Sequence, residues 1–267
     1  MMETAKKKTR MRVLENRELA EGIYSLLAQY EKGQAPGEVR PGQFAGLFPP
    51  DPACMLMRPI SICEWRRDLA ALRFVYRAGG KGTRSLSGLK RGDEVSMLGI
   101  LGNGYDTGSM AGKEVLLMGG GIGIPPMLEL AKSLSSLPGT RVRALLGYRN
   151  EELFLFEDFQ RVCEAFAATD DGSAGFHGTV TDAARALGLS ADVICACGPM
   201  PMLRAVAGLA EEMDAECFMS LEERMACGVG ACLGCVAKTR EVDGHSHVKN
   251  ARVCTEGPVF RARDVEI

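Results

Sequence analysis

The sequence predicts a multi-domain fold of three consecutive units: an antiparallel β-barrel, a Rossmann-like parallel α/β domain and a small C-terminal domain. Three observations predict it. Short, partly alternating apolar runs separated by Gly and Pro turns occupy roughly the first hundred residues. Apolar strands then alternate with helical stretches, and four cysteines gather near the C-terminus. We expect the three domains to span residues 1–109, 110–215 and 216–267.

The composition of the 267-residue chain argues against several classes of function. Its 32 basic and 34 acidic residues nearly balance, which disfavours a surface for nucleic acid or an acidic membrane. No apolar run reaches the ~18 residues of a membrane span, and the basic stretch 6–10 is not followed by the apolar segment of a signal peptide. We therefore expect a reducing, cytoplasmic location, where five cysteines are small core residues: Cys54, Cys63, Cys163, Cys195 and Cys217.

The barrel prediction rests on strands expected over residues 11–14, 22–27 and 72–77. Turns such as Arg40-Pro-Gly42 separate these runs. Several short strands at such spacing are typical of a small barrel. The composition changes at residues 110–113, where the second domain is expected to begin.

Two motifs of the first domain suit a phosphate-bearing ligand. In Arg58-Pro-Ile-Ser61, the guanidinium suits a pyrophosphate and the hydroxyl suits a ring nitrogen or carbonyl. A turn that merely needs Pro59 explains this motif equally well. Further on, Gly79-Gly-Lys-Gly-Thr83 opens a helix predicted over 84–90, and a Gly-rich turn before a helix N-terminus offers free N–H groups to an anion. The two motifs together are more specific than either alone.

The second domain is predicted from strands over 114–118, 141–148 and 192–197 that alternate with helices over 127–137 and 203–213. Such alternation indicates a parallel sheet covered by helices.

Two Gly-containing segments follow strands of this sheet. Gly119-Gly-Gly-Ile-Gly123 departs from the G-x-G-x-x-G fingerprint because its last glycine comes one residue early. It still joins a strand to a helix, with Pro125 and Pro126 in the first turn, so we expect a phosphate-bearing ligand there; a plain tight turn is the alternative. Cys197-Gly-Pro-Met200 repeats the arrangement, which places its thiol at the sheet edge where ligands bind.

The C-terminal cysteines carry the strongest signal in the chain. Cys227, Cys232, Cys235 and Cys254 are spaced C-x4-C-x2-C-x18-C, the plant-type [2Fe–2S] pattern of three ligands in one loop and a fourth from a later segment. Three thiolates so close in sequence converge only if the backbone wraps the cluster. Amide N–H groups of such a loop also point at the sulfides and raise the potential. Three glycines permit this wrap: Gly228, Gly230 and Gly234.

Two other metal centres use similar ligands. Zinc sites take four cysteines, but they usually join two short pairs, whereas Cys254 is solitary. A Rieske centre needs histidines paired with cysteines, and His245 and His247 lie apart from any such pair. They belong to an excursion in which Asp243-Gly244 is predicted as the turn of a hairpin between 236–240 and 246–249.

Taken together, these motifs resemble the ferredoxin–NADP reductase superfamily, and within it the family of electron-transfer subunits of class 1B, NAD-dependent dihydroorotate dehydrogenases. The most specific part of the resemblance is the stretch 220–235, with Glu223 and Arg224 before the first cysteine. The resemblance implies that the barrel binds FAD through Arg58, Pro59, Ile60, Ser61, Val75, Tyr76, Arg77, Gly82 and Thr83. It implies that the nicotinamide site is shaped by Gly119, Gly120, Gly121, Gly123, Cys197, Gly198, Pro199 and Met200.

The resemblance also implies a partner and a reaction. The partner is an FMN-containing catalytic subunit that oxidises dihydroorotate in pyrimidine (UMP) biosynthesis, in a heterotetramer with two copies of each chain. Electrons pass between that FMN and NAD through the [2Fe–2S] cluster and FAD, because a flavin exchanges hydride with nicotinamide and single electrons with a cluster. Such a chain needs no general acid or base, and we expect no catalytic residue. By itself it should act as an NADH-oxidising diaphorase.

Alternatives stay open at this point. After the strand 141–148, a carboxylate in 149–152 suits the ribose of NAD, whereas Arg149 suits the 2′-phosphate of NADP; the resemblance favours NAD. Small subunits of NAD(P)H-dependent ferredoxin or sulfide oxidoreductases share the layout, but some carry Asp in place of the first cluster cysteine, so Cys227 favours the dihydroorotate family. A zinc-stabilised, nucleotide-sensing regulator is a non-enzymatic alternative, which leaves the first-domain motifs unexplained.

Overall fold

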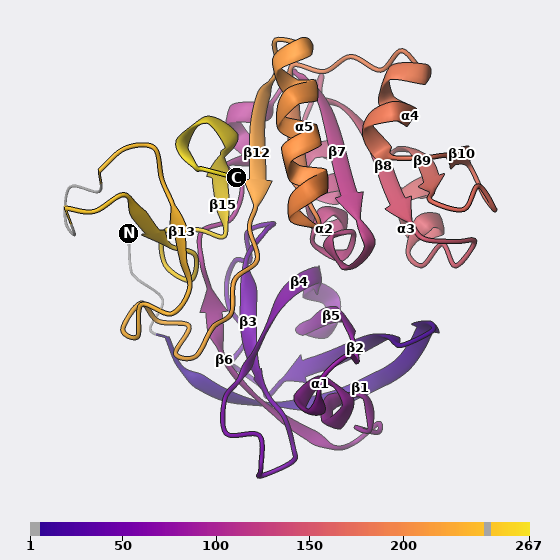
Figure 1. Cartoon of the computed structure of the whole chain (residues 1–267). Coiled ribbons are helices and arrows are strands. Elements are labelled where there is room, and N and C mark those ends of the chain that lie inside the picture. The colour runs from indigo at the N-terminus through magenta and orange to yellow at the C-terminus, as the bar shows by residue number, and fades with distance from the viewer. Residues whose placement is uncertain (1–5, 243–246) are drawn as a thin grey trace.

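The computed structural model describes residues 6–242 and 247–267. Six antiparallel strands close into a barrel, which forms the lower part of Figure 1. They are β1 (Lys8–Ala20), β2 (Ile23–Tyr30), β3 (Phe44–Phe48), β4 (Arg58–Arg66), β5 (Ala71–Arg77) and β6 (Glu94–Leu101). Their order around the barrel is β1-β2-β5-β4-β3-β6. Short helices η1 (Arg67–Leu69) and α1 (Lys81–Ser87) lie in the connections.

Alternation of apolar and polar residues closes the barrel. In β1, Met11 and Val13 are buried while their neighbours Arg10 and Arg12 are exposed, because successive side chains of a strand point to opposite faces. The larger apolar side chains fill the interior, among them Phe74 and Tyr76 from β5.

The second unit is a seven-stranded sheet in the order β10-β9-β8-β7-β11-β12-β15. Its strands are β7 (Glu114–Gly120), β8 (Arg141–Tyr148), β9 (Glu164–Thr169), β10 (Phe176–His177), β11 (Val193–Cys197), β12 (Glu216–Ser220) and β15 (Val259–Arg261). All neighbours pair in parallel except β12 and β15. The helices are η2 (Thr107–Met110), η3 (Gly121–Gly123), α2 (Pro125–Ser135), α3 (Phe156–Gln160), α4 (Val180–Ala186), α5 (Met200–Glu212) and η4 (Ala262–Asp264).

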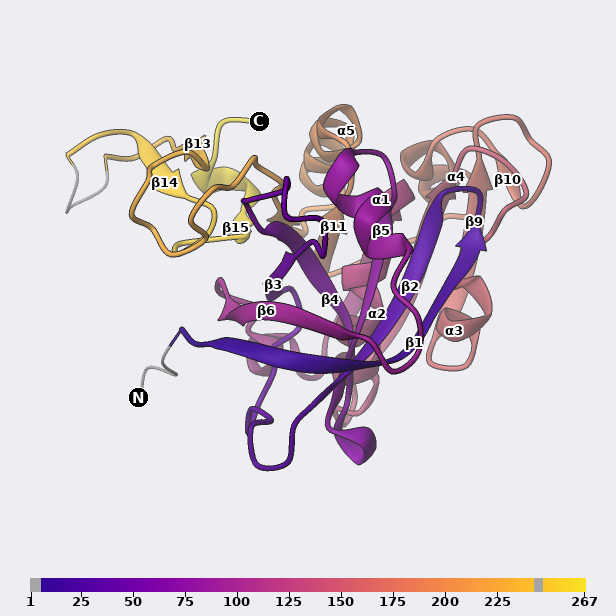
Figure 2. The same cartoon turned by 90° about the horizontal axis from the view of Figure 1, so that it is seen from below.

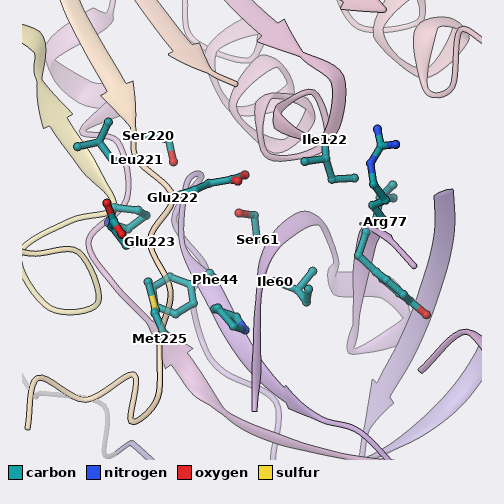
Figure 3. Close-up of a pocket in the computed structure, with 14 residues that line it drawn as sticks. Phe44, Ile60, Ser61, Arg77, Ile122, Ser220, Leu221, Glu222, Glu223 and Met225 are labelled. Atoms are coloured by element: carbon teal, nitrogen blue, oxygen red, sulfur yellow. The ribbon is translucent and has the colours of Figure 1, made fainter. Parts of the chain in front are cut away.

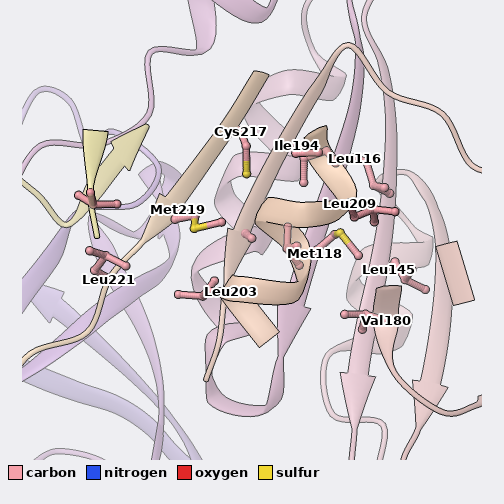
Figure 4. Close-up of a cluster of buried hydrophobic side chains, with 14 of the residues drawn as sticks. Leu116, Met118, Leu145, Val180, Ile194, Leu203, Leu209, Cys217, Met219 and Leu221 are labelled. Atoms are coloured by element: carbon pink, nitrogen blue, oxygen red, sulfur yellow. The ribbon is translucent and has the colours of Figure 1, made fainter. Parts of the chain in front are cut away.

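Helices cover both faces of this sheet. Leu116 and Met118 of β7 face α4 and α5, as Figure 4 shows, while Leu117 between them belongs to the core under α2 and α3. A strand buried on both faces is a continuous apolar run, which explains the sequence of β7 and β8. Within the described ranges, no helix is both long and apolar enough to cross a membrane.

The cysteine-rich segment runs from the end of β12 through a small ribbon and back to the sheet. The ribbon pairs β13 (Val236–Lys238) with β14 (Asn250–Arg252) in antiparallel fashion. Figure 2 shows it beside β15, at the periphery of the molecule. Asn103, just after β6, anchors the turn that follows β14 to the barrel, because its Nδ2 donates to the carbonyl of Thr255 over 2.8 Å.

Several predicted elements need adjustment. Pro59 lies in β4 opposite Gly46, so the reading of its motif as a simple turn is wrong. The first helix begins at Lys81, three residues earlier than expected, because Gly80 is its N-cap and the Thr83 hydroxyl accepts from the Gly80 N–H over 3.1 Å. The second strand of the predicted hairpin is 250–252 rather than 246–249. Its predicted turn, Asp243-Gly244, lies outside the described residues.

The predicted domain bounds divide one sheet. Residues 216–220 and 259–261, assigned by sequence to the C-terminal domain, form β12 and β15 at the edge of the seven-stranded sheet. The physical reason is that β12 is apolar and pairs in register with all five residues of β11. The C-terminal unit therefore leaves from the sheet and returns to it.

A network of charged side chains joins the barrel to the sheet helices. Glu64 of β4 accepts from Lys132 of α2 over 2.5 Å and from Arg73 of β5 over 3.4 Å. Arg73 also reaches Asp158 of α3 over 3.2 Å. Glu129 of α2 accepts from a backbone N–H of β4 over 2.9 Å. Glu64 and Arg73 have side chains only 10% and 14% exposed, so water screens this pair weakly.

We expect replacement of Glu64 by Ala to lower the free energy of unfolding by about 3 kcal/mol, because it leaves the nearly buried Arg73 without one of its counter-charges. Urea unfolding followed by the fluorescence of Trp65, the single tryptophan, measures this. The matched control is Glu157→Ala, which removes an ion pair whose carboxylate side chain is 83% exposed and should leave the midpoint unchanged. Equal midpoints for the two variants would refute the stabilising role of the network.

Candidate functional site

The first pocket, of about 250 Å³, lies between the barrel and the sheet (Figure 3). Neighbouring strands β4 and β5 supply one wall, and the end of β12 supplies the opposite one. Six predicted FAD contacts line it together: Pro59, Ile60, Ser61, Val75, Tyr76 and Arg77. The mixture of apolar walls with a hydroxyl and a guanidinium suits a flat, polar-edged ring system.

Three other predicted FAD contacts meet outside this pocket. The Arg58 guanidinium lies against Gly82 in the first turn of α1, and a Cβ on Gly82 would overlap it. Arg58 Nη1 donates to the Leu56 carbonyl over 2.7 Å, which orients the guanidinium. Thr83 bonds to the Gly80 backbone and so caps the helix. The structure therefore brings a fixed cation to the Gly-rich turn, the combination that suits a pyrophosphate.

The second pocket, of about 920 Å³, opens at the carboxyl ends of β7, β8, β9 and β11. Five predicted nicotinamide-site residues line it: Gly120, Gly121, Gly123, Gly198 and Pro199. Arg77 and Glu222 line both pockets, so the pockets adjoin. A Cβ on Gly123 would overlap the Cys197 carbonyl, which explains why this close approach of two loops needs glycine.

The other three predicted members of this group do not line either pocket. Gly119 packs against Ile124. Met200 begins α5 and is partly buried. Cys197 is 1% exposed, and burial raises the pKa of its thiol, so it is a neutral core group next in the chain to Gly198, which lines the second pocket.

Glu222 is a site residue that the sequence analysis missed. Its side chain projects into the first pocket, as does that of Ser61 (Figure 3). It is exposed at the mouth of both pockets, and the protein packed around that mouth partly desolvates its carboxyl group and raises its pKa. In the sequence, the run Glu222-Glu223-Arg224 has the composition of a solvated surface. The signal that identifies Glu222 is its place just after a strand, at the edge of the sheet where ligands bind.

The cysteine loop, residues 225–235, wraps around its first thiol. The backbone N–H groups of Val229 and Cys232 each donate to Cys227 Sγ over 3.4 Å. Gly228 and Gly230 have φ of 68° and 83°, which favours glycine. Burial acts to raise the pKa of Cys227, but these backbone hydrogen bonds and one from the Cys232 side chain outweigh it and lower the pKa to about 6. Cys227 is therefore a thiolate near neutral pH, which is the ligand form.

The four predicted ligands are arranged in two pairs. The Cys232 side chain contacts Cys227, and the Cys235 side chain contacts Cys254. Among residues 6–242 and 247–267, no three His, Cys, Asp or Glu side chains converge as they would around a single ion. A [2Fe–2S] centre takes two protein ligands on each iron, and these contacting pairs suit that ligand set. Burial, and then Cys235, raise the pKa of Cys254 to about 11, a repulsion that bound cations would relieve.

The cysteine loop also adjoins the first pocket. Met225 lines that pocket and precedes Cys227 by two residues. Met57, next to Arg58, packs against Gly228, where a Cβ would overlap its side chain. The two pockets and the cysteine loop therefore form one continuous site.

Comparison with known proteins agrees with this geometry. The model of the iron-sulfur cluster binding domain of dihydroorotate dehydrogenase B matches residues 222–266, which contain all four predicted ligands. The dihydroorotate dehydrogenase B (NAD(+)) electron transfer subunit of Bacillus cereus strain 03BB102 is 40% identical over 97% of this chain and 98% of that protein.

Two solved structures share the fold. That of the NADH-dependent reduced ferredoxin-NADP oxidoreductase, studied for flavin-based electron bifurcation, matches 100% of this chain and 91% of that one, with a TM-score of 0.83 and 27% identity. A ferredoxin NADP+ reductase from Neisseria gonorrhoeae, with bound FAD and NADP, matches 78% of this chain and 92% of that one, with a TM-score of 0.63 and 14% identity.

We expect the anaerobically purified chain to contain about two irons and two acid-labile sulfides and no stoichiometric zinc. Replacing Cys232 by Ser should lower both contents sharply, because it removes one of four ligands. Cys54→Ser, at a partly buried thiol outside the cysteine loop, is the matched control and should leave them unchanged. One zinc per chain without sulfide would instead favour the zinc-stabilised regulator.

Proposed function

The chain belongs to the family of dihydroorotate dehydrogenase B (NAD(+)) electron transfer subunits, and from this we propose that it passes electrons between a dihydroorotate dehydrogenase catalytic subunit and NAD+. The observation that carries the proposal is 40% identity over 97% of the chain, with four paired cysteines inside the matched cluster domain. The catalytic subunit contains FMN, and the pair of subunits serves UMP biosynthesis.

The cofactors are FAD and a [2Fe–2S] cluster, with NAD as co-substrate. When bound, FAD exchanges hydride with nicotinamide and single electrons with the cluster. Ser61 would hold the flavin ring in the first pocket, and Arg58 would hold its pyrophosphate beside Gly82, whereas the Tyr76 side chain packs in the barrel core. The cluster ligands are Cys227, Cys232, Cys235 and Cys254, and the NAD contacts are those of the second pocket.

The chain's own residues contribute position rather than proton transfer. Arg77 and Glu222 lie where the two pockets meet, so they border the place where nicotinamide faces flavin. Glu222 places a carboxyl group there whose pKa the surrounding protein raises by desolvation. The Cys197 thiol, neutral and buried, supports the floor of the nicotinamide site.

The catalytic subunit docks on the face that carries the cysteine loop. Cys232 is exposed, and Leu233 beside it is 61% exposed. Met55, at 86%, and Leu56, at 52%, lie in the loop that leads to Met57, which touches the cysteine loop. Apolar side chains left in water around a redox centre suit a protein partner. We assign two copies of each chain to the complete assembly.

We also propose three domains, residues 1–109, 110–215 and 216–267, each with one cofactor site. The third is not a separate sheet, because its strands β12 and β15 belong to the sheet of the second domain. A cytoplasmic location is also proposed. Its support is that the six cysteines other than the predicted cluster ligands, all within the described residues, are free thiols, as a reducing compartment keeps them.

A second candidate is the small subunit of an NADH-dependent ferredoxin oxidoreductase. The TM-score of 0.83 over the whole chain to such an enzyme favours it. This candidate ranks second, because the chain is 40% identical to a dihydroorotate dehydrogenase subunit and only 27% identical to this oxidoreductase. The partner distinguishes the two, because the chemistry within this chain is the same.

We expect the isolated, cofactor-replete chain to oxidise NADH with a dye as acceptor and to leave dihydroorotate untouched. Addition of the FMN-containing catalytic subunit should then couple dihydroorotate oxidation to NAD+ reduction. Activity is followed by NADH absorbance. Turnover of dihydroorotate by the chain alone, or coupling only with ferredoxin, would contradict the assignment.

We expect Asp170 to select NAD over NADP. It lines the second pocket just beyond β9, where its carboxylate suits a ribose hydroxyl and repels a 2′-phosphate. Replacing Asp170 by Ala should reduce the preference for NADH over NADPH in kcat/KM at least about tenfold, the value of one charged hydrogen bond. The control is Asp171→Asn, because the wild-type Asp171 carboxylate instead accepts from the Ser173 N–H. An unchanged preference in the Asp170 variant would assign the selection to Arg149 or Glu152.

A further inference from the structure

Gly230, in the middle of the cysteine loop, is held at both ends of its backbone. Its N–H group faces the sulfur of Cys254, the last predicted ligand, and acts to lower the pKa of that thiol. The carbonyl of Gly230 accepts from Arg252 Nη1 over 3.4 Å. Arg252 therefore bonds to the carbonyl of the same residue whose N–H group faces the ligand sulfur.

Arg252 is itself fixed by Glu256. The guanidinium Nε donates to Glu256 Oε1 over 2.9 Å, and Nη2 and the Arg252 backbone N–H also donate to this carboxylate. The turn that contains both residues is anchored to the barrel, because Asn103 Nδ2 donates to the carbonyls of Thr255 and Glu256 over 2.8 and 3.2 Å. The guanidinium thus has a defined position rather than a freely moving one.

Arg252 and Glu256 lie close to the predicted cluster, because they flank the ligand Cys254 in the sequence. Arg252 and Glu256 precede and follow Cys254 by two residues each, which limits each Cα to roughly 7 Å from the Cα of that ligand. Their side chains are 34% and 37% exposed, so water screens them only in part. Reduction adds one electron to a cluster, so a nearby positive charge favours the reduced form and a nearby negative charge disfavours it.

We propose that Arg252 and Glu256 form a positioning pair that sets the reduction potential of the cluster. Arg252 raises the potential through its charge and by holding the Gly230 N–H toward Cys254. Glu256 orients Arg252 and offsets its charge, which keeps the potential low enough for electrons to leave. This inference rests on the proposed function, because it requires a cluster on the four cysteines.

The test is a redox titration of the full-length, anaerobically purified chain, with the reduced cluster followed by electron paramagnetic resonance. Arg252→Gln should lower the reduced-to-oxidised ratio at fixed potential at least about threefold, and Glu256→Gln should raise it by a similar factor. Each shift corresponds to about 28 mV for a one-electron couple, at 59 mV per tenfold. Arg252→Lys, which keeps the charge but loses the planar fork, should lie between wild type and Arg252→Gln.

The matched control is Arg261→Gln. Arg261 pairs with Glu216 over 3.3 Å at similar exposure, 45% and 35%, but in the strands β15 and β12. Its potential should equal that of the wild type. With iron and sulfide contents intact, unchanged potentials or shifts of the same sign in the Arg252 and Glu256 variants would overturn the inference alone. A wild-type chain without iron and sulfide would overturn the proposed function as well.

Discussion

The covalent continuity of residues 220–227 is the constraint on which the arrangement of the site depends. Ser220 ends β12 at the edge of the sheet, Glu222 and Met225 line the pockets, and Cys227 is the first predicted cluster ligand. A chain of that length cannot span more than roughly 3.3–3.6 Å per residue. The sheet, the flavin pocket and the cluster are therefore held together by the chain itself, whatever the surrounding contacts.

The ion pairs between the barrel and the sheet helices fix the orientation that this chain continuity leaves open. A tether fixes a maximum distance but no orientation, and nicotinamide and flavin react only when their rings overlap. Glu64, Arg73 and Lys132 provide directional contacts between the barrel and α2. Asn103 does the same between the barrel and the turn that contains Cys254. The barrel thus has polar contacts with both other units, alongside the apolar contacts that hold them together.

Much of the fold follows from local pattern. The continuous apolar runs of β7, β8 and β11 had the length and composition of strands buried on both faces, and they are confirmed as such. The strand over 72–77 is likewise confirmed as part of β5. Elements with weaker patterns were not predicted. β10 has only two residues, and β15 is a short strand after a proline whose partner, β12, lies far back in the sequence. Such strands exist because an edge is available to pair with.

By itself, the sequence determined the chemistry: the four-cysteine spacing, the Gly-rich turns and the Arg-Pro-x-Ser motif depend on residues close together in the chain, where backbone reach limits geometry. Only the tertiary structure decided how these pieces meet. It placed Arg58 against Gly82, joined two pockets at Arg77 and Glu222, and brought Arg252 to the carbonyl of Gly230. Those contacts link segments 22 to 145 residues apart. No local preference encodes them, because they arise only when separate elements pack.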